Sequence, residues 1–106
     1  MAGLENVDVT IVSDRVIADL HLRFMNVKGP TDVITFDHGE IIISAPMAKI
    51  YAEKFGKPLD HEIGLYIIHG LLHLNGYKDK APADARAMHK LQNQILKICL
   101  ANPLCR

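Results

Sequence analysis

Two kinds of spacing between apolar residues divide the chain into strand-like and helix-like segments. Residues 7–12 alternate apolar and polar side chains and are rich in β-branched residues, which predicts a strand. Residues 32–36 and 40–43 have the same character on either side of a short turn at 37–39. A connection this short is typical of an antiparallel hairpin, so the sequence predicts three short strands.

Two helices are predicted to begin at serine residues. Ser13 can cap a helix whose apolar positions recur at three and four residues, and residues 28–30 (Lys-Gly-Pro) end it. Ser44 can cap a second helix, with Pro46 near its first turn and an end near Gly56. These two helices flank the predicted hairpin.

Two longer helices are predicted in the second half. One begins near Asp60 and ends at residues 75–76, where Asn-Gly is a good helix stop. The last begins at Pro82 and continues to about Leu100. Its periodicity predicts an inward face formed by Ala87, Leu91, Ile95 and Ile98.

The predicted order βαββααα indicates an α+β fold, in which a small mixed sheet of about three strands packs with four helices. The chain of 106 residues is one domain's worth, so we expect a single domain over residues 1–106. The helix that carries residues 69 and 73 should be central and largely buried. The expected core consists of Val33, Ile34, Ile41, Ile43, Ile63, Ile67, Leu71 and Leu91.

Net charge narrows the range of partners. The formal net charge of zero argues against a protein that coats nucleic acid by bulk electrostatics. The charge is nevertheless uneven, since residues 1–40 hold seven acids and three bases, whereas residues 41–106 hold nine bases and five acids. This asymmetry is either ordinary scatter or a basic face in the second half that can meet phosphates.

The cysteine content and the N-terminus indicate a cytoplasmic protein. Two cysteines, Cys99 and Cys105, cannot form a disulfide framework, which favours a reducing compartment. The first ten residues lack the basic-then-apolar layout of a secretion signal, and no apolar run approaches the roughly 20 residues of a membrane span.

Candidate chemistry is concentrated around His69 and His73. Two histidines four residues apart on a helix project from one face and can bind a single metal ion. In a chain with this histidine content, about 0.3 pairs at this spacing are expected by chance. The usual alternative for each histidine is a core residue whose ring nitrogens are hydrogen-bonded within the protein. Gly76 ends the helix, and the next two residues can turn the chain so that Asp79 returns toward the imidazoles.

Two nitrogens and one carboxylate oxygen leave a fourth tetrahedral position for water, which is typical of catalytic zinc. Zinc lowers the pKa of bound water to roughly 7. A metallopeptidase of the His-Glu-x-x-His type is disfavoured, because Gly70 occupies the position of the general base. The remaining histidines compete poorly for the metal on sequence position: His21, His38, His61 and His89.

Three motifs, in order, resemble the YbeY family, the bacterial zinc-dependent rRNA maturation factors. Residues 69–77 read His-Gly-Leu-Leu-His-Leu-Asn-Gly-Tyr and resemble the family signature His-Gly-x-Leu-His-Leu-x-Gly-Tyr-Asp-His. Residues 30–36 (Pro-Thr-Asp-Val-Ile-Thr-Phe) resemble its Pro-Thr-Asp-Val-Leu-Ser-Phe strand, and residues 39–44 resemble its Gly-Asp-Ile-x-Ile-Ser strand. The resemblance covers about residues 7–98 and implies a YbeY-like fold and a divalent metal, normally Zn²⁺.

The chain departs from the family pattern at three places. It lacks the additional strand and helix with which family members usually begin. The third family ligand is His, and an ungapped count places Asp79 there, whereas a one-residue insertion would place Lys80 there. We prefer Asp79, because a carboxylate binds zinc and a protonated lysine does not. The family's Tyr-Arg pair before the Pro-Thr-Asp strand is Phe24-Met25 here.

The resemblance implies a metal-dependent endoribonuclease, a hydrolase that acts on rRNA in maturation and ribosome quality control. Its partners would be RNA and ribosomal proteins or ribosome-associated factors. Lys78 and Lys80, close to the ligands, and Arg23, close to the missing family arginine, are candidate RNA-binding residues. The alternatives are a non-catalytic ribosome-associated or protein-binding module with a structural or vestigial metal and, less favoured, a metallopeptidase.

Overall fold

The computed structural model describes residues 6–101, so Cys105 lies outside the described part. The predicted element order and the α+β fold class are confirmed. None of the helices between residues 6 and 101 is long and apolar enough to span a membrane. The elements are β1 (Asp8–Val12), α1 (Asp14–Met25), β2 (Val33–Phe36), β3 (Glu40–Ser44), α2 (Ala45–Phe55), α3 (Leu59–Leu74) and α4 (Pro82–Ala101).

The three strands form one mixed sheet in the order β1-β3-β2. β1 pairs in parallel with β3, and β2 pairs antiparallel with β3, which confirms the predicted hairpin. The turn closes where the amide of Gly39 donates to the carbonyl of Phe36 at 2.9 Å. Gly39 has a φ of 101°, a conformation that glycine adopts without steric cost.

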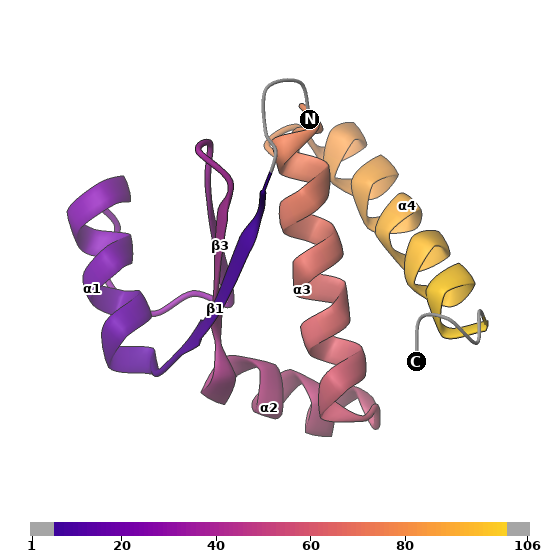
Figure 1. Cartoon of the computed structure of the whole chain (residues 1–106), viewed down its shortest axis with the longest axis horizontal. Coiled ribbons are helices and arrows are strands. Elements are labelled where there is room, and N and C mark those ends of the chain that lie inside the picture. Colours follow the sequence, from indigo (N-terminus) through magenta and orange to yellow (C-terminus); the bar gives the residue numbers. More distant parts are fainter. Residues whose placement is uncertain (1–5, 102–106) are drawn as a thin grey trace.

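Helices cover both faces of the sheet, with α1 on one side and α3 on the other (Figure 1). Successive residues of a strand point to opposite faces, so β3 contributes to two cores. Ile41 and Ile43 are fully buried in a cluster with α2 and α3, whereas Ile42 packs with Ile17 of α1 and Ile34 of β2. The central strand thus connects the two halves of the core.

Both predicted serine caps are confirmed. Ser13 Oγ accepts a hydrogen bond from the amide of Val16, and Ser44 Oγ accepts one from the amide of Met47. Ser44 is fully buried and donates to the carboxylate of Asp14 at 2.8 Å. This bond ties the start of α2 to the start of α1, and thereby fixes both helices to the end of β3.

The predicted core is confirmed in its centre. Ile34, Ile41 and Ile43 are buried, and no residue from position 61 to position 74 of α3 is exposed, so this helix is central as expected. The other five expected core residues are half-buried: Val33, Ile63, Ile67, Leu71 and Leu91.

The predicted inward face of α4 is right at Leu91 and Ile95, which are half-buried, and wrong at its two ends. Ala87 and Ile98 are exposed, the latter by 68%, whereas Met88 and Leu96 are buried. The apolar stripe of a core-facing helix is wide, so the sequence alone allows either the predicted or the observed set of residues to face inward. Packing decides between them, because Gly64 of α3 leaves room for the Leu96 side chain: a Cβ there would lie 3.1 Å from Leu96 Cδ1.

A glycine sets how closely α3 approaches the sheet. Gly70 is buried between the two histidines of the motif, and a Cβ there would lie 2.8 Å from Ile41 Cδ1 and 3.0 Å from Thr35 Oγ1. A side chain at this position would require Ile41, Thr35 or the helix itself to shift. Gly70 therefore fixes the height of the neighbouring histidines above the sheet.

Candidate metal centre

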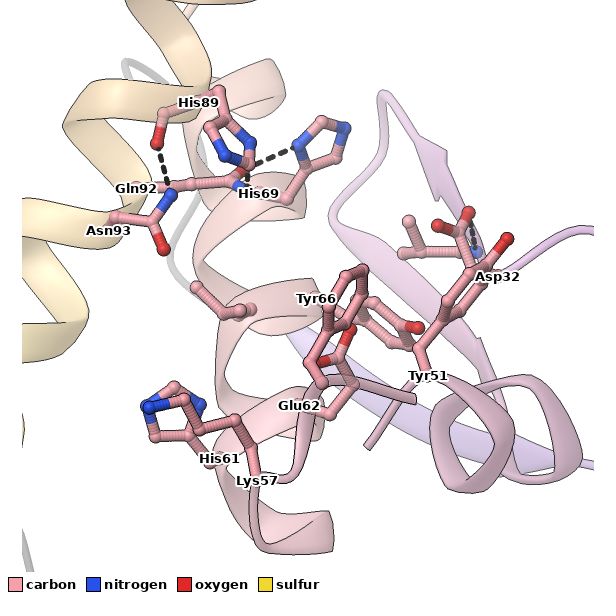
Figure 2. Close-up of a pocket in the computed structure, with 13 residues that line it drawn as sticks. Asp32, Tyr51, Lys57, His61, Glu62, Tyr66, His69, His89, Gln92 and Asn93 are labelled. Atoms are coloured by element: carbon pink, nitrogen blue, oxygen red, sulfur yellow. Dashed lines mark hydrogen bonds between the residues drawn. The ribbon is translucent and has the colours of Figure 1, made fainter. Parts of the chain in front are cut away.

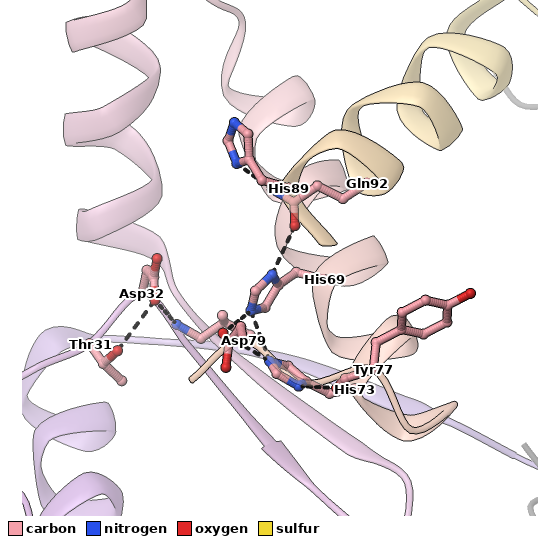
Figure 3. A network of polar contacts seen from close by, with 9 residues as sticks. Thr31, Asp32, His69, His73, Tyr77, Asp79, His89 and Gln92 are labelled. Atoms are coloured by element: carbon pink, nitrogen blue, oxygen red, sulfur yellow. Dashed lines mark hydrogen bonds and ion pairs between the residues drawn. The ribbon is translucent and has the colours of Figure 1, made fainter. Parts of the chain in front are cut away.

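His69 and His73 project from the last turns of α3 toward the same point (Figure 3). Their Nε2 atoms lie 3.0 Å apart. Asp79 Oδ2 lies 3.5 Å from His69 Nε2 and 3.4 Å from His73 Nε2. Within the described residues, these three are the group of His, Cys, Asp and Glu side chains that could hold a metal ion.

The loop after α3 brings Asp79 to the histidines. The amide of Tyr77 donates back to the carbonyl of Leu72 at 3.1 Å, and Gly76 has a φ of 93°. A positive φ immediately after a helix reverses the chain, and glycine adopts it readily. Asp79 therefore lies next to the imidazoles where the sequence placed it, although its role as a ligand stays a prediction.

The spacing of the three donor atoms fits a tetrahedral metal ion. Bonds of about 2.0–2.1 Å in a regular tetrahedron imply distances of about 3.3–3.4 Å between ligand atoms. The observed distances of 3.0, 3.4 and 3.5 Å bracket that value. Three ligands occupy one face of such a tetrahedron and leave the fourth position open.

Hydrogen bonds to the far ring nitrogens show which atoms face the metal position. His73 Nδ1 donates to the backbone carbonyl of Tyr77 at 3.0 Å, and His69 Nδ1 donates to Gln92 Oε1 at 2.8 Å. In neutral imidazoles the Nε2 atoms then carry lone pairs. Two lone pairs and the carboxylate of Asp79 converge on one point, an arrangement that a bound cation stabilises.

The centre lies at the boundary between two clefts that share His69 and Asp32. The first, of about 460 Å³, opens over His73, Asp79 and Lys80. The second, of about 600 Å³, extends along α3 in the opposite direction. His69 and His73 keep 24% and 29% of their side chains exposed and Asp79 keeps 40%, so a ligand can reach the metal position from solvent.

The three predicted RNA-binding residues lie in different surroundings. Lys80 lines the cleft over the metal centre, together with Met25. Lys78 is exposed on the loop just before Asp79. Arg23 lies on α1, pairs with Asp19 at 3.3 Å and does not line either cleft.

The other histidines are not metal neighbours. His38 pairs with Glu40 at 3.4 Å and stacks on Phe36 in the hairpin turn. His61 and His89 line the larger cleft, and His89 Nδ1 lies 3.5 Å from Gln92 Nε2. The cluster therefore consists of His69, His73 and Asp79, and their role as metal ligands stays a prediction.

Gln92 and the carbonyl of Tyr77 are hydrogen-bond partners of the two histidines that the sequence did not reveal. Gln92 lies on the inner face of α4, four residues from the buried Met88 and four from the buried Leu96. A polar residue at the centre of an inward-facing row must find a buried partner. That spacing could have pointed to Gln92, but only with the correct phase of α4.

Comparisons with known proteins agree with this arrangement. The family model described as Endoribonuclease YbeY matches residues 2–99. The chain is 36% identical to Endoribonuclease YbeY of Rhodococcus opacus over 107 residues, which cover 83% of this chain and 59% of that protein. It is also 36% identical to Endoribonuclease YbeY of Thermobifida fusca, over 88% of this chain and 71% of that protein.

The fold has a solved counterpart. The solution structure of TM1509 from Thermotoga maritima matches with a TM-score of 0.63 and 29% identity, over 87% of this chain and 67% of that one. The chain spans about three fifths of the length of the Rhodococcus relatives it matches. With the family motifs in order, the YbeY fold and the His/His/Asp cluster at the end of α3, the chain belongs to the Endoribonuclease YbeY family.

Proposed function

We propose that the protein is a metal-dependent endoribonuclease that acts on rRNA in maturation and ribosome quality control. The observation that carries the proposal is the convergence of His69 Nε2, His73 Nε2 and Asp79 Oδ2 at tetrahedral spacing beside an open cleft. Membership of the Endoribonuclease YbeY family supplies the reaction class and the RNA substrate.

We propose Zn²⁺ as the metal, held by His69, His73 and Asp79. Imidazole and carboxylate ligands with one open position suit zinc, and bound zinc supplies a Lewis acid and a water of lowered pKa for phosphodiester hydrolysis. Gln92 and the Tyr77 carbonyl orient the two rings, so that each Nε2 points to the metal without rearrangement. Lys80, on the wall of the same cleft, is placed to attract the RNA backbone.

A non-catalytic, ribosome-associated role is the second candidate, and Met25 favours it. This side chain lines the cleft over the metal centre at the position of the family arginine, and methionine cannot hold a phosphate. A metallopeptidase is disfavoured, because a glutamate at position 70 would collide with Ile41 and Thr35. Under either ribosomal role we propose ribosomal proteins as further partners and the cytoplasm as the compartment, because ribosomes are assembled there.

Cleavage of a structured rRNA fragment, with metal content measured on the same sample, tests the proposal. We expect zinc-dependent cleavage by the native chain, loss of metal and activity in His73→Ala, and no change in the matched control His38→Ala. His38 is suitable because 70% of its side chain is exposed in the hairpin turn. Stoichiometric metal without cleavage would favour the non-catalytic role, and absence of metal would refute both the centre and the hydrolase.

A further inference from the structure

The larger cleft, on the other side of His69, is a second candidate site. It has a volume of about 600 Å³ and is lined by the start of β2 and by α2, α3 and α4 (Figure 2). Nothing in the metal chemistry uses this space. We call it the aromatic cleft and define it by Asp32, Tyr51, Phe55, Glu62, Tyr66 and His69.

Two polar side chains in the aromatic cleft are buried, and one of them has no hydrogen-bond partner in the described part of the chain. Glu62 and Tyr66 are each only 6% exposed. The Tyr66 hydroxyl makes no hydrogen bond within the described residues. Burial, with the negative charge of Glu62 adding to it, raises the pKa of Tyr66 well above its ordinary value, so the hydroxyl stays protonated.

A buried hydroxyl without a hydrogen bond and a buried carboxylate both carry a desolvation penalty. Side chains of this kind persist in native proteins where a ligand or an ordered water completes their hydrogen bonds. Glu62 adds a specific requirement, because an ionised carboxylate only accepts hydrogen bonds. A ligand that contacts Glu62 must therefore present hydrogen-bond donors to it.

The walls of the aromatic cleft are flat and apolar. Tyr51 and Phe55 lie one helical turn apart on α2, with ring centroids 6.1 Å apart and ring planes within 13° of each other. Tyr66 of α3 contributes a third ring. Aromatic faces of this kind stack on nucleobases, which also combine apolar faces with polar edges.

The position of the aromatic cleft connects it to the metal centre. His69 lines both clefts, and its Nε2 faces Asp79 while its Nδ1 bonds to Gln92. His69 therefore separates the aromatic cleft from the metal position, and Glu62 lies seven residues earlier on α3, about 10 Å along the helix axis. In RNA, the pairing edge of a purine is separated from its own phosphate by the base and one ribose, which is a comparable distance.

We propose that the aromatic cleft binds a guanine base of the RNA, next to the phosphodiester at the metal centre, with Glu62 as the residue that selects it. The inference rests on the proposed nuclease function for its biological meaning. Guanine carries two adjacent donors, N1–H and the N2 amino group, which match the two oxygens of one carboxylate. Adenine, cytosine and uracil each present an acceptor beside their donor, which a carboxylate repels.

Titration with guanosine 5′-monophosphate tests this site without requiring cleavage. We expect shifts of amide resonances around Glu62 and Tyr66 in an NMR titration, and binding at least about tenfold tighter than for the adenosine, cytidine or uridine monophosphates. Equal affinity for all four nucleotides, or shifts confined to the metal centre, would overturn the proposal. Because the readout is binding, it separates failure of the cleft from failure of the nuclease.

Two variants assign the selection to particular side chains. Glu62→Gln keeps the shape but replaces one acceptor with a donor, so the preference for guanosine 5′-monophosphate should fall about tenfold. Glu53→Gln is the matched control, because Glu53 is an exposed α2 residue that does not line the cleft. Tyr51→Leu should weaken all four nucleotides by a similar factor. An unchanged preference in a folded Glu62→Gln variant would refute the role of Glu62.

Discussion

The helices on the two faces of the sheet differ in how much of their apolar surface is buried. On the α3 face, Ile41 and Ile43 are fully buried, and α3 itself packs against both α2 and α4. On the opposite face α1 covers Ile42 but leaves much of its own apolar surface exposed. Its exposed apolar residues include Val16, Leu22, Phe24 and Met25.

The better-packed face is the one that carries the candidate metal centre. All three candidate metal ligands belong to the α3 face, two on α3 and one on the loop that follows it. A metal centre needs its donor atoms fixed to a fraction of an ångström, which a helix supported on several sides provides. The α1 face carries no such requirement within the described residues, and it tolerates a thinner core.

The largest effect is expected from removal of a ligand on the α3 face. Asp79→Ala should lose most of the metal affinity, because the site retains two of three donors, whereas Asp79→His should retain metal. Elemental analysis after dialysis against a mild chelator measures both. Asp19→Ala, an acid on α1 that pairs with Arg23, is the control and should leave metal content unchanged. Stoichiometric zinc in Asp79→Ala would remove Asp79 from the site.

Truncation of one apolar side chain on each side of the sheet should sharpen the contrast, because Ile41 is fully buried whereas Phe24 is mostly exposed. Ile41→Ala leaves a cavity in the fully buried cluster and should lower the free energy of unfolding by about 2–5 kcal/mol. Phe24→Ala, on α1, removes a ring that is 61% exposed and makes one edge-to-face contact with Phe36, so the loss should be about 1 kcal/mol or less. Urea denaturation gives both values, and equal losses would contradict the comparison.

The contact between α3 and the sheet predicts an overpacking effect. Gly70→Ala places a Cβ against the buried side chain of Ile41 and should destabilise by about 1–3 kcal/mol, which exceeds the gain in helix propensity. Gly64→Ala meets a single terminal methyl of Leu96 and should change stability less. Thermal unfolding of the two variants, with metal affinity measured alongside, separates strain from simple loss of the centre.

A variant of Gln92 tests whether α4 contributes to metal affinity as well as to the core. Gln92→Ala removes the acceptor of His69 Nδ1 and should weaken metal binding about 10–100-fold while leaving all three ligands in place. Asn93→Ala is the control on the same helix, since Asn93 Nδ2 donates to the carbonyl of His89 and not to a candidate ligand. Competition with a chromogenic chelator measures the affinities. Equal affinity in both variants would assign Gln92 a purely structural role.

The smallest effect is expected from reversal of two lysine charges close to the metal centre. Lys78→Glu combined with Lys80→Glu should reduce RNA retention and lower its dependence on salt, because fewer counterions are released on binding. The variant should unfold at the same temperature as the native chain, since both positions are exposed. Unchanged binding would place the RNA surface elsewhere, and Arg23→Glu on the α1 face would then be compared.

The sequence predicted the elements and the ligand cluster because their signals are local. Ser13, Ser44 and Gly76 mark ends of helices through their own backbone chemistry, and the helical period alone places His69 and His73 on one face. The phase of α4 was mispredicted because it depends on contacts between helices. The inward position of Gln92 follows from that phase. The aromatic cleft combines side chains from the start of β2 and from α2 and α3, so it could be found only in three dimensions.

The position of His69 has a thermodynamic consequence. Its ring is the wall between the two clefts, with one nitrogen directed to each side. A ligand that shifts this ring from the aromatic cleft changes the affinity of the metal centre. Linkage then requires the metal to change the affinity of that ligand by the same factor and in the same direction. Occupancy of the two clefts would then be coupled through the side chain of His69.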